Sequence, residues 1–231
     1  MDARDTMFEV KNLACSRGNK PLFGAVSFSL NAGQALHLEG DNGVGKTSLL
    51  RILCGLSPAD AGEVLWQGRS VQADSSAFRA ALFYLGHNLS LKEELSALEN
   101  LQADAAVAGR TLTTEQALVA LARMGLRGRE HLPLRVMSQG QKRRTALARL
   151  LASQASLWVL DEPFVALDAK AVDGLRSVLA GHVAQGGIVL FTSHQPITLQ
   201  RADGAPLAVQ SYRLQSVQPQ TPQRAPQKVQ P

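Results

Sequence analysis

The stretch Gly40-Asp-Asn-Gly-Val-Gly-Lys46-Thr47 combines glycines with a lysine and a threonine at the spacing G-x-x-x-x-G-K-[ST]. The glycines let successive backbone N–H groups point at one phosphate, and a following helix adds the positive end of its dipole. Lys46 would reach the β- and γ-phosphates, and the Thr47 hydroxyl would hold Mg²⁺. A glycine-rich turn is the simpler alternative, but the Lys-Thr pair in register favours phosphate binding. The predicted binding residues are Gly40, Asp41, Asn42, Gly43, Val44, Gly45, Lys46, Thr47 and Ser48.

Two adjacent carboxylates, Asp161 and Glu162, follow the apolar run Leu157–Leu160. Asp161 would support the Mg²⁺ shell through water, which suits a cation that keeps several of its waters. Glu162 would orient an attacking water and act as a general base. A solvated acidic pair at the end of a strand is the alternative, and the phosphate-binding pattern earlier in the chain favours nucleotide hydrolysis.

Strands and helices must bring these side chains together. The phosphate-binding pattern lies between a short apolar run, 35–38, and a predicted helix, 48–54. Runs at 157–160 and 187–192 are continuously apolar, as in parallel strands that are covered on both faces. Strands that alternate with helices predict an α/β sheet. Further strands are predicted at 7–13, 25–30, 63–68 and 81–85, and a helical insertion at about 88–150.

Composition sets the outer limits. The chain has 231 residues, 45% of them hydrophobic, and a net charge of +5. The charge could suit nucleic acid, but no nucleic-acid-reading motif is present, so we expect no such partner. Two cysteines predict neither a disulfide framework nor a metal site, which favours a reducing cytoplasm. We see no signal peptide and no membrane-spanning run. The stretch 205–231, rich in Gln and Pro towards its end, is predicted to be a disordered tail.

The segment Val136-Met-Ser138-Gln-Gly140-Gln141, followed by a basic helix, resembles the Leu-Ser-Gly-Gly-Gln signature of ATP-binding cassette (ABC) proteins. Met137 and Gln139 depart from that pattern. An ordinary capped helix is the alternative. In the family, the signature faces the ATP held by the other protomer, so two ATP molecules lie between the chains of a head-to-tail dimer. The resemblance therefore implies that Ser138, Gly140 and Gln141 contact nucleotide across a dimer of this chain.

Further matches follow in the family's order. Ala166-Leu-Asp168 resembles the D-loop, and His194 follows a predicted strand as the family's switch histidine does. The resemblance implies that His194 contacts the γ-phosphate and acts in catalysis with Glu162 and Lys46. His87 stands where the family's Q-loop glutamine is expected. Arg17 stands near the position of the aromatic residue that stacks on adenine, and a guanidinium can also stack on a base.

The resemblance covers roughly residues 7–200 and implies the fold. We expect an α/β structure of the ABC ATPase type, a P-loop NTPase (RecA-like) core with an antiparallel β subdomain and an inserted helical subdomain. The ATP-binding domain is predicted to span residues 1–204, with the helical subdomain at about 88–150 and the tail after it. The implied cofactors are ATP and Mg²⁺, with Thr47 and Asp161 at the metal.

Several shorter stretches look like the ATP-binding subunits of bacterial cytochrome c maturation systems. These are 63–68, 85–87, 97–101, 157–158, 186–189 and 194–196. That resemblance implies an ATP-hydrolysing subunit for haem export or delivery in c-type cytochrome biogenesis. It would be peripheral, bound to integral membrane subunits on the cytoplasmic face of the bacterial inner membrane. Two alternatives remain, the ATPase of a transporter for another small molecule and a non-transport ABC ATPase.

Overall fold

A five-stranded parallel sheet lies at the centre of the computed structural model, which describes residues 6–18, 20–73 and 75–216. Its strand order is β11–β3–β8–β7–β6. All neighbouring strands are parallel, so their carboxyl ends meet at one edge. The strands are β3 (Ala35–Glu39), β6 (Leu82–Leu85), β7 (Leu157–Leu160), β8 (Ile188–Thr192) and β11 (Val209–Arg213).

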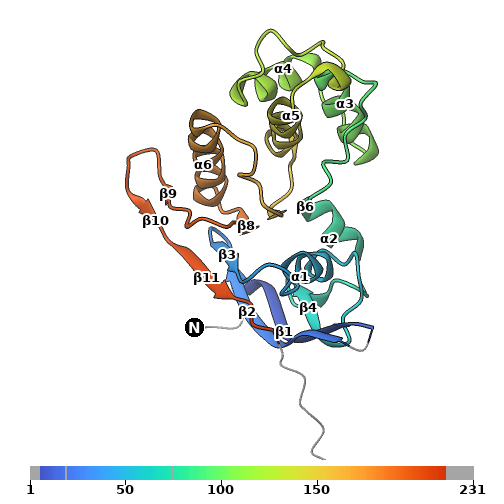
Figure 1. Ribbon diagram of the computed structural model, residues 1–231, viewed down its shortest axis with the longest axis vertical. Coiled ribbons are helices and arrows are strands. Elements are labelled where there is room, and N and C mark those ends of the chain that lie inside the picture. The colour runs from blue at the N-terminus through green and yellow to red at the C-terminus, as the bar shows by residue number, and fades with distance from the viewer. Residues whose placement is uncertain (1–5, 19, 74, 217–231) are drawn as a thin grey trace, which may run out of the picture.

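An antiparallel sheet packs at one end of the molecule, below the central sheet in Figure 1. Its order within the described residues is β2–β1–β4–β5. The strands are β1 (Thr6–Arg17), β2 (Lys20–Asn31), β4 (Ala61–Trp66) and β5 (Arg69–Ser70). The alternating stretches 7–13 and 25–30 therefore lie inside two longer paired strands. A small antiparallel pair, β9 (Leu199–Gln200) and β10 (Pro206–Leu207), lies near α6.

The helices divide between the two faces of the central sheet. Helix α1 lies on the side of the antiparallel sheet, whereas α3, α4 and α5 form a helical subdomain at the opposite end of the molecule (Figure 1). The bounds are α1 Lys46–Leu53, α2 Ser75–Ala81, α3 Ala97–Val107, α4 Thr114–Arg123, α5 Gln139–Ala152 and α6 Ala169–Ala184, with a 3₁₀ turn at Leu134–Val136. None of the helices in the described ranges combines the length and apolar character needed to cross a lipid bilayer.

Two hydrophobic clusters cover the two faces of the central sheet. On β7, Leu157 and Val159 belong to the cluster around α1, whereas Trp158 and Leu160 belong to the cluster of the helical subdomain and α6. Side chains of a strand alternate between faces, so a strand that is buried on both must be apolar throughout. This explains the continuous apolar runs that the sequence shows at these strands.

The predicted end of the domain at residue 204 is wrong. Strand β11 pairs in parallel with β3, from Val209 beside Ala35 to Arg213 beside Glu39. Leu214, just beyond, is buried, and its N–H donates to the Glu39 carbonyl at 2.9 Å. The segment was missed because β11 is short and half polar, and it is ordered by pairing with a strand far earlier in the chain. Residues 217–231 of the predicted tail lie outside the described residues.

Candidate active site

The turn between β3 and α1 is shaped by glycines. Gly45, the N-cap residue of α1, has φ +107°, a conformation that side chains with a Cβ rarely adopt. A Cβ on Gly40 would lie 2.9 Å from the Leu214 carbonyl oxygen, so a larger residue would displace the chain there. No described side chain caps α1, and its first turn holds no acidic residue. The first N–H groups of the helix therefore point into the loop without a side-chain acceptor.

Lys46 lies across the mouth of this loop. Its ammonium group donates to the Gly40 carbonyl at 2.7 Å and to the Asp41 carbonyl at 3.2 Å. These contacts hold the positive charge over the N-terminus of α1, where backbone N–H groups also converge. The arrangement places one mobile and several fixed donors around the same space, which suits an anion with several oxygens.

A hydrogen-bonded chain joins α1 to the ends of β7 and β8. The Thr47 hydroxyl donates to Asp161 Oδ2 at 2.8 Å, and the Thr192 hydroxyl donates to Asp161 Oδ1 at 2.9 Å. The Glu162 N–H in turn donates to the Thr192 hydroxyl at 2.8 Å. Asp161 and Thr192 are both buried. Both Asp161 oxygens are thus held by hydroxyl donors, which fixes the carboxylate and offsets the cost of burying its charge.

Sequence reasoning gave Thr192 no role, although a signal was available. Leu160 on β7 pairs in register with Phe191 on β8, so the residues that follow, Asp161 and Thr192, are neighbours at the same sheet edge. Parallel pairing of the two predicted apolar strands would have placed a hydroxyl beside the carboxylates.

The phenol of Tyr84 on β6 lies near one of these carboxylates, that of Asp161. Burial, together with the nearby Asp161 charge, raises the pKa of Tyr84 to about 12, so the phenol stays neutral.

Glu162 follows directly and is held in an unusual backbone conformation, with φ +49°. Its Oε1 lies 3.5 Å from Nε2 of His194, a residue in the loop that follows β8. Most of the Glu162 side chain is covered, whereas His194 is largely exposed. A positive φ at a residue other than glycine indicates a conformation that the surroundings impose. The carboxylate is therefore presented at the sheet edge by the structure around it.

Arg143, which sequence reasoning also missed, supplies part of that constraint. Its Nη2 donates to the carbonyl of Asp161 at 3.1 Å and also to the carbonyl of Glu162. The guanidinium is buried, and desolvation lowers its pKa while the carboxylates of Asp161 and Glu162 oppose that shift. Arg143 lies in a basic run on α5, and nothing in that run distinguishes it from its less buried neighbours Lys142 and Arg144. Its side chain ties the helix after the signature-like segment to the two carboxylate residues.

A cavity of about 320 Å³ collects most of the predicted residues from five parts of the chain. Arg17 comes from the end of β1, His87 follows β6, and His194 follows β8. The full lining is Arg17, Leu22, Asn42, Gly43, Gly45, Lys46, Thr47, Ser48, His87, Asp161, Glu162 and His194. Val44 is buried beneath the loop, and Gly40 and Asp41 line a neighbouring cavity. The site thus offers cations and backbone donors on one side and two carboxylates on the other.

Ser138, Gly140 and Gln141 lie elsewhere. Ser138 caps α5, its hydroxyl accepting from the Gln141 N–H at 3.3 Å while the Gln141 amide oxygen accepts from the Ser138 N–H at 3.0 Å. A Cβ on Gly140 would come within 3.2 Å of the Ala166 carbonyl, so this turn packs closely on the D-loop-like segment. Of the described residues that line the 320 Å³ cavity, none belongs to this group. Within one chain, the signature-like segment and the phosphate-binding loop do not meet.

The fold and this site define an ABC ATPase. The family model described as ABC transporter matches residues 23–165, more than half of the chain. The chain is 50% identical over 193 residues to "Cytochrome c biogenesis ATP-binding export protein CcmA" of Dechloromonas aromatica, covering 84% of this chain and 95% of that protein. The protein of that name from Escherichia coli K12 is 47% identical, with 84% and 91% covered. The chain belongs to this family of cytochrome c biogenesis ATP-binding export proteins.

Solved structures confirm the fold class. A putative ABC transporter ATP-binding protein from Pyrococcus furiosus superposes with a TM-score of 0.75 at 23% identity, covering 90% of this chain and 96% of that one. An ATP-binding cassette solved as a dimer bound to ADP and phosphate gives 0.74 at 22% identity, with 87% and 97% covered. At these identities the likeness concerns the fold alone.

Proposed function

We propose that this chain is the ATP-hydrolysing subunit of an inner-membrane complex that exports or delivers haem for c-type cytochrome biogenesis. The family relationship supports this assignment, since the relatives named above are cytochrome c biogenesis ATP-binding export proteins that span nearly the same length. The observation that carries the catalytic part is the hydrogen-bonded chain from Thr47 through Asp161 and Thr192 to Glu162. These hydrogen bonds would hold the groups proposed to bind the metal and to activate water in fixed positions relative to one another.

Each residue of the cavity would have a distinct role in binding the nucleotide and its metal. Lys46 and the N–H groups of the loop hold the triphosphate, releasing the contacts that Lys46 makes to the Gly40 and Asp41 carbonyls. The Thr47 hydroxyl would offer an oxygen ligand of the kind that Mg²⁺ prefers, Asp161 would support the shell through a water, and further waters and phosphate oxygens would complete it. When bound, Mg²⁺ neutralises charge on the phosphate oxygens. His87 and Arg17 line the same cavity and would contact the nucleotide.

Glu162 would accept the proton of a water that attacks the γ-phosphorus. As the new oxygen–phosphorus bond forms, the bond between the γ-phosphorus and the bridging oxygen breaks and ADP leaves. His194 would contact the γ-phosphate and report its presence through the 3.5 Å approach to Glu162. Pre-positioned donors at the loop would stabilise the charge that develops in the transition state.

Chemistry would require two chains. Ser138, Gly140 and Gln141 do not reach the cavity of their own chain, so they would complete the site of a second copy in a head-to-tail dimer. The uncapped start of α1 and the turn before α5 would then face each other across the nucleotide. Integral membrane subunits on the cytoplasmic side of the inner membrane would receive the motion that dimer closure produces.

The experiment replaces the resident gene of a bacterium that makes c-type cytochromes with this chain or with its Glu162→Gln variant. We expect covalently bound haem to appear with the wild type and to be lost with the variant, which should still bind ATP. Glu63→Gln on β4 is the matched control, because Glu63 is exposed and is not among the residues that line the cavity. Equal maturation with wild type and Glu162→Gln would contradict the proposal.

The same strains separate the alternatives. If purified wild-type chain hydrolyses ATP and Glu162→Gln does not, yet c-type haem never depends on either, the chain serves a transporter for another small molecule. Sedimentation with membranes should depend on co-expression of the integral partner subunits. A chain that hydrolyses ATP but never sediments with them would favour a non-transport ATPase.

A further inference from the structure

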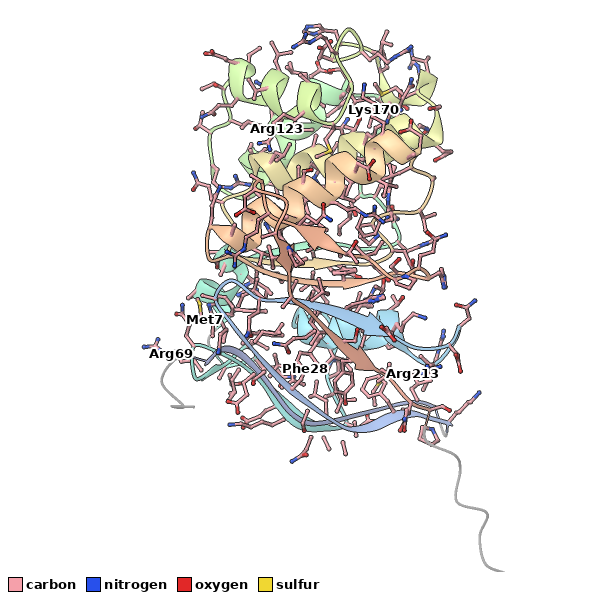
Figure 2. All side chains as sticks on the ribbon, turned by 90° about the vertical axis from the view of Figure 1, so that its left-hand side faces the viewer. Met7, Phe28, Arg69, Arg123, Lys170 and Arg213 are labelled. Atoms are coloured by element: carbon pink, nitrogen blue, oxygen red, sulfur yellow. The ribbon has the colours of Figure 1, made fainter. Side chains whose placement is uncertain are left out.

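A second cavity, of about 410 Å³, lies beside the phosphate-binding loop on the side of β11. Its lining joins β3, the start of the loop, the segment after β8 and the end of β11, where Figure 2 labels Arg213. We call residues 193–196, the segment that carries His194, the switch segment. His37 on β3 and Glu39 two residues later face the switch segment across this cavity.

His37 is buried and makes polar contacts at both ring nitrogens. Its Nε2 lies 3.1 Å from the Ser193 carbonyl oxygen, and because a carbonyl only accepts, that nitrogen must carry a proton. Its Nδ1 lies 3.4 Å from Glu39 Oε1. The Ser211 hydroxyl on β11 donates to the same Glu39 oxygen at 2.9 Å. The ring thus lies between a backbone carbonyl that accepts from Nε2 and, beside Nδ1, a carboxylate anchored by Ser211.

The ring also stacks on Phe191, with centroids 5.0 Å apart and planes inclined by 7°. Phe191 in turn meets the edge of Phe164, which lies just beyond Glu162 in the chain. Before His37, this face of β3 and β8 is apolar, with Ala35 and Val189 in the same hydrophobic cluster as Phe191. An apolar residue would fill the position without the cost of desolvating an imidazole. The polar atoms of His37 instead hold the carbonyl immediately before His194.

We propose that His37, oriented by Glu39, is a positioning residue that fixes the switch segment so that His194 meets Glu162. The inference rests on the proposed function of His194 and Glu162. Ser193 and His194 are consecutive, so a shift of the Ser193 carbonyl moves the imidazole whose Nε2 lies 3.5 Å from Glu162. Small displacements of reacting groups lower rates while leaving binding intact. His37 therefore acts on the rate of hydrolysis and not on the affinity for ATP.

The test compares two substitutions in the full-length chain by steady-state ATP hydrolysis. His37→Phe keeps a ring that can stack on Phe191 and removes both nitrogens, whereas His37→Gln keeps an N–H that can donate to the Ser193 carbonyl. We expect His37→Phe to lower kcat about three- to tenfold, as the loss of one hydrogen bond allows. KM for ATP should change less than about twofold, since Lys46 and the loop N–H groups, which would hold the triphosphate, are unchanged. His37→Gln should recover most of the rate.

His182→Phe is the matched control. His182 is also a covered histidine that stacks on an aromatic ring, Trp158, and contacts a backbone carbonyl, that of Ser156, but it lies far from the cavity on α6. Both Phe variants should lose similar thermal stability, and only His37→Phe should lose kcat. Should His37→Phe fail to fold, Glu39→Gln gives a milder test on a partly exposed side chain and should lower kcat by a smaller factor.

Coupling to His194 decides the mechanism. In a His194→Ala background, His37→Phe should have little further effect on kcat, because both changes then act through one group. Additive losses, a loss shared by His182→Phe, or no rescue by His37→Gln would overturn the inference. Glu162→Gln, run alongside, distinguishes a second failure, since undiminished hydrolysis in that variant would refute the proposed catalytic site itself.

Discussion

Helices α1 and α5 both begin at a glycine-containing turn near Asp161 and Glu162, yet their N-termini are capped differently. Helix α5 has a capping box in which Ser138 and Gln141 satisfy each other's N–H groups. Helices α3 and α4 have the same device. Helix α1 begins at Gly45, and among the described residues no side chain caps it. The terminus without a side-chain cap is the one that lines the 320 Å³ cavity.

The difference indicates where a ligand would supply the hydrogen-bond acceptors that no described side chain provides. The first N–H groups of a helix need acceptors; no described side chain supplies them at α1, and under the proposed function phosphate oxygens would do so. At α5 the Ser138 oxygen already accepts from the Gln141 N–H, but a hydroxyl still has its own hydrogen to donate. The N-terminus of α5 therefore has its cap within the chain, and under the proposed function Ser138 would add a contact to the nucleotide of a second copy. We propose that the two termini are a phosphate-binding site and the segment of a second copy that completes it.

The largest effect should come from Lys46→Ala, which removes the cation at the uncapped terminus. A charged hydrogen bond of this kind accounts for roughly 10- to 100-fold in ATP affinity. Calorimetric titration with ATP measures the change. Arg51→Ala is the control, because Arg51 carries the same charge on the last turn of the same helix and is exposed. Equal affinity of wild type and Lys46→Ala would remove the phosphate role from this terminus.

The next effect should come from Ser138→Ala at the capped terminus of α5. Loss of a cap should lower the free energy of unfolding by about 1 kcal/mol. If Ser138 also donates to nucleotide in a second copy, ATP hydrolysis should fall roughly tenfold as well. Chemical denaturation and steady-state hydrolysis measure the two quantities on the same preparation.

Thr113→Ala is the matched control for that change, since Thr113 caps α4 with the same geometry and a glutamine partner. It should lose a similar free energy of unfolding and keep its rate of hydrolysis. If both variants lose hydrolysis in proportion to stability, α5 contributes only structure and the contrast between the two termini disappears.

Much of the site was predictable because its residues lie in short, contiguous sequence patterns. The strand, loop and helix around residues 35–54 follow one another directly, and the apolar run before Asp161 is continuous. Parallel strands then bring the carboxyl ends of β3, β7 and β8 to one edge, so the phosphate-binding loop, Glu162 and His194 line one cavity. The local signals and the general rule for parallel sheets were sufficient there.

The remainder depends on contacts between distant parts of the chain. Arg143 sits between Lys142 and Arg144, and only the packing of α5 against the end of β7 turns one of these three inward. His37 interrupts an apolar run, and its partners come from β8 and β11. The strand β11 was mistaken for part of a tail because β-structure of five residues takes its stability from the neighbouring strand. Such features follow from tertiary packing.

The smallest effect concerns the partner residue in the capping boxes, which is Glu99 in α3 and glutamine in α4 and α5. The Ser96 backbone N–H, followed by the Ser96 hydroxyl, lowers the pKa of Glu99 below its ordinary value of 4.5. Because the folded-state pKa lies below the unfolded one, the stabilisation is complete above about pH 4.5 and is lost as the pH falls through the folded value. Glu99→Gln should remove this pH dependence, since a glutamine box does not titrate.

Thermal unfolding midpoints would be measured from neutral pH down to about pH 3. The difference in midpoint between wild type and Glu99→Gln, called the gap below, should narrow on acidification. Glu115→Gln is the control, because Glu115 lies in the first turn of α4 outside that helix's capping box, where the helix dipole favours a negative charge. Its gap should narrow less. A gap for Glu99→Gln that stays constant with pH would mean that the ionised carboxylate adds nothing to the box. The three capping boxes would then be equivalent, and the charge that distinguishes the uncapped terminus of α1 would be that of the bound nucleotide.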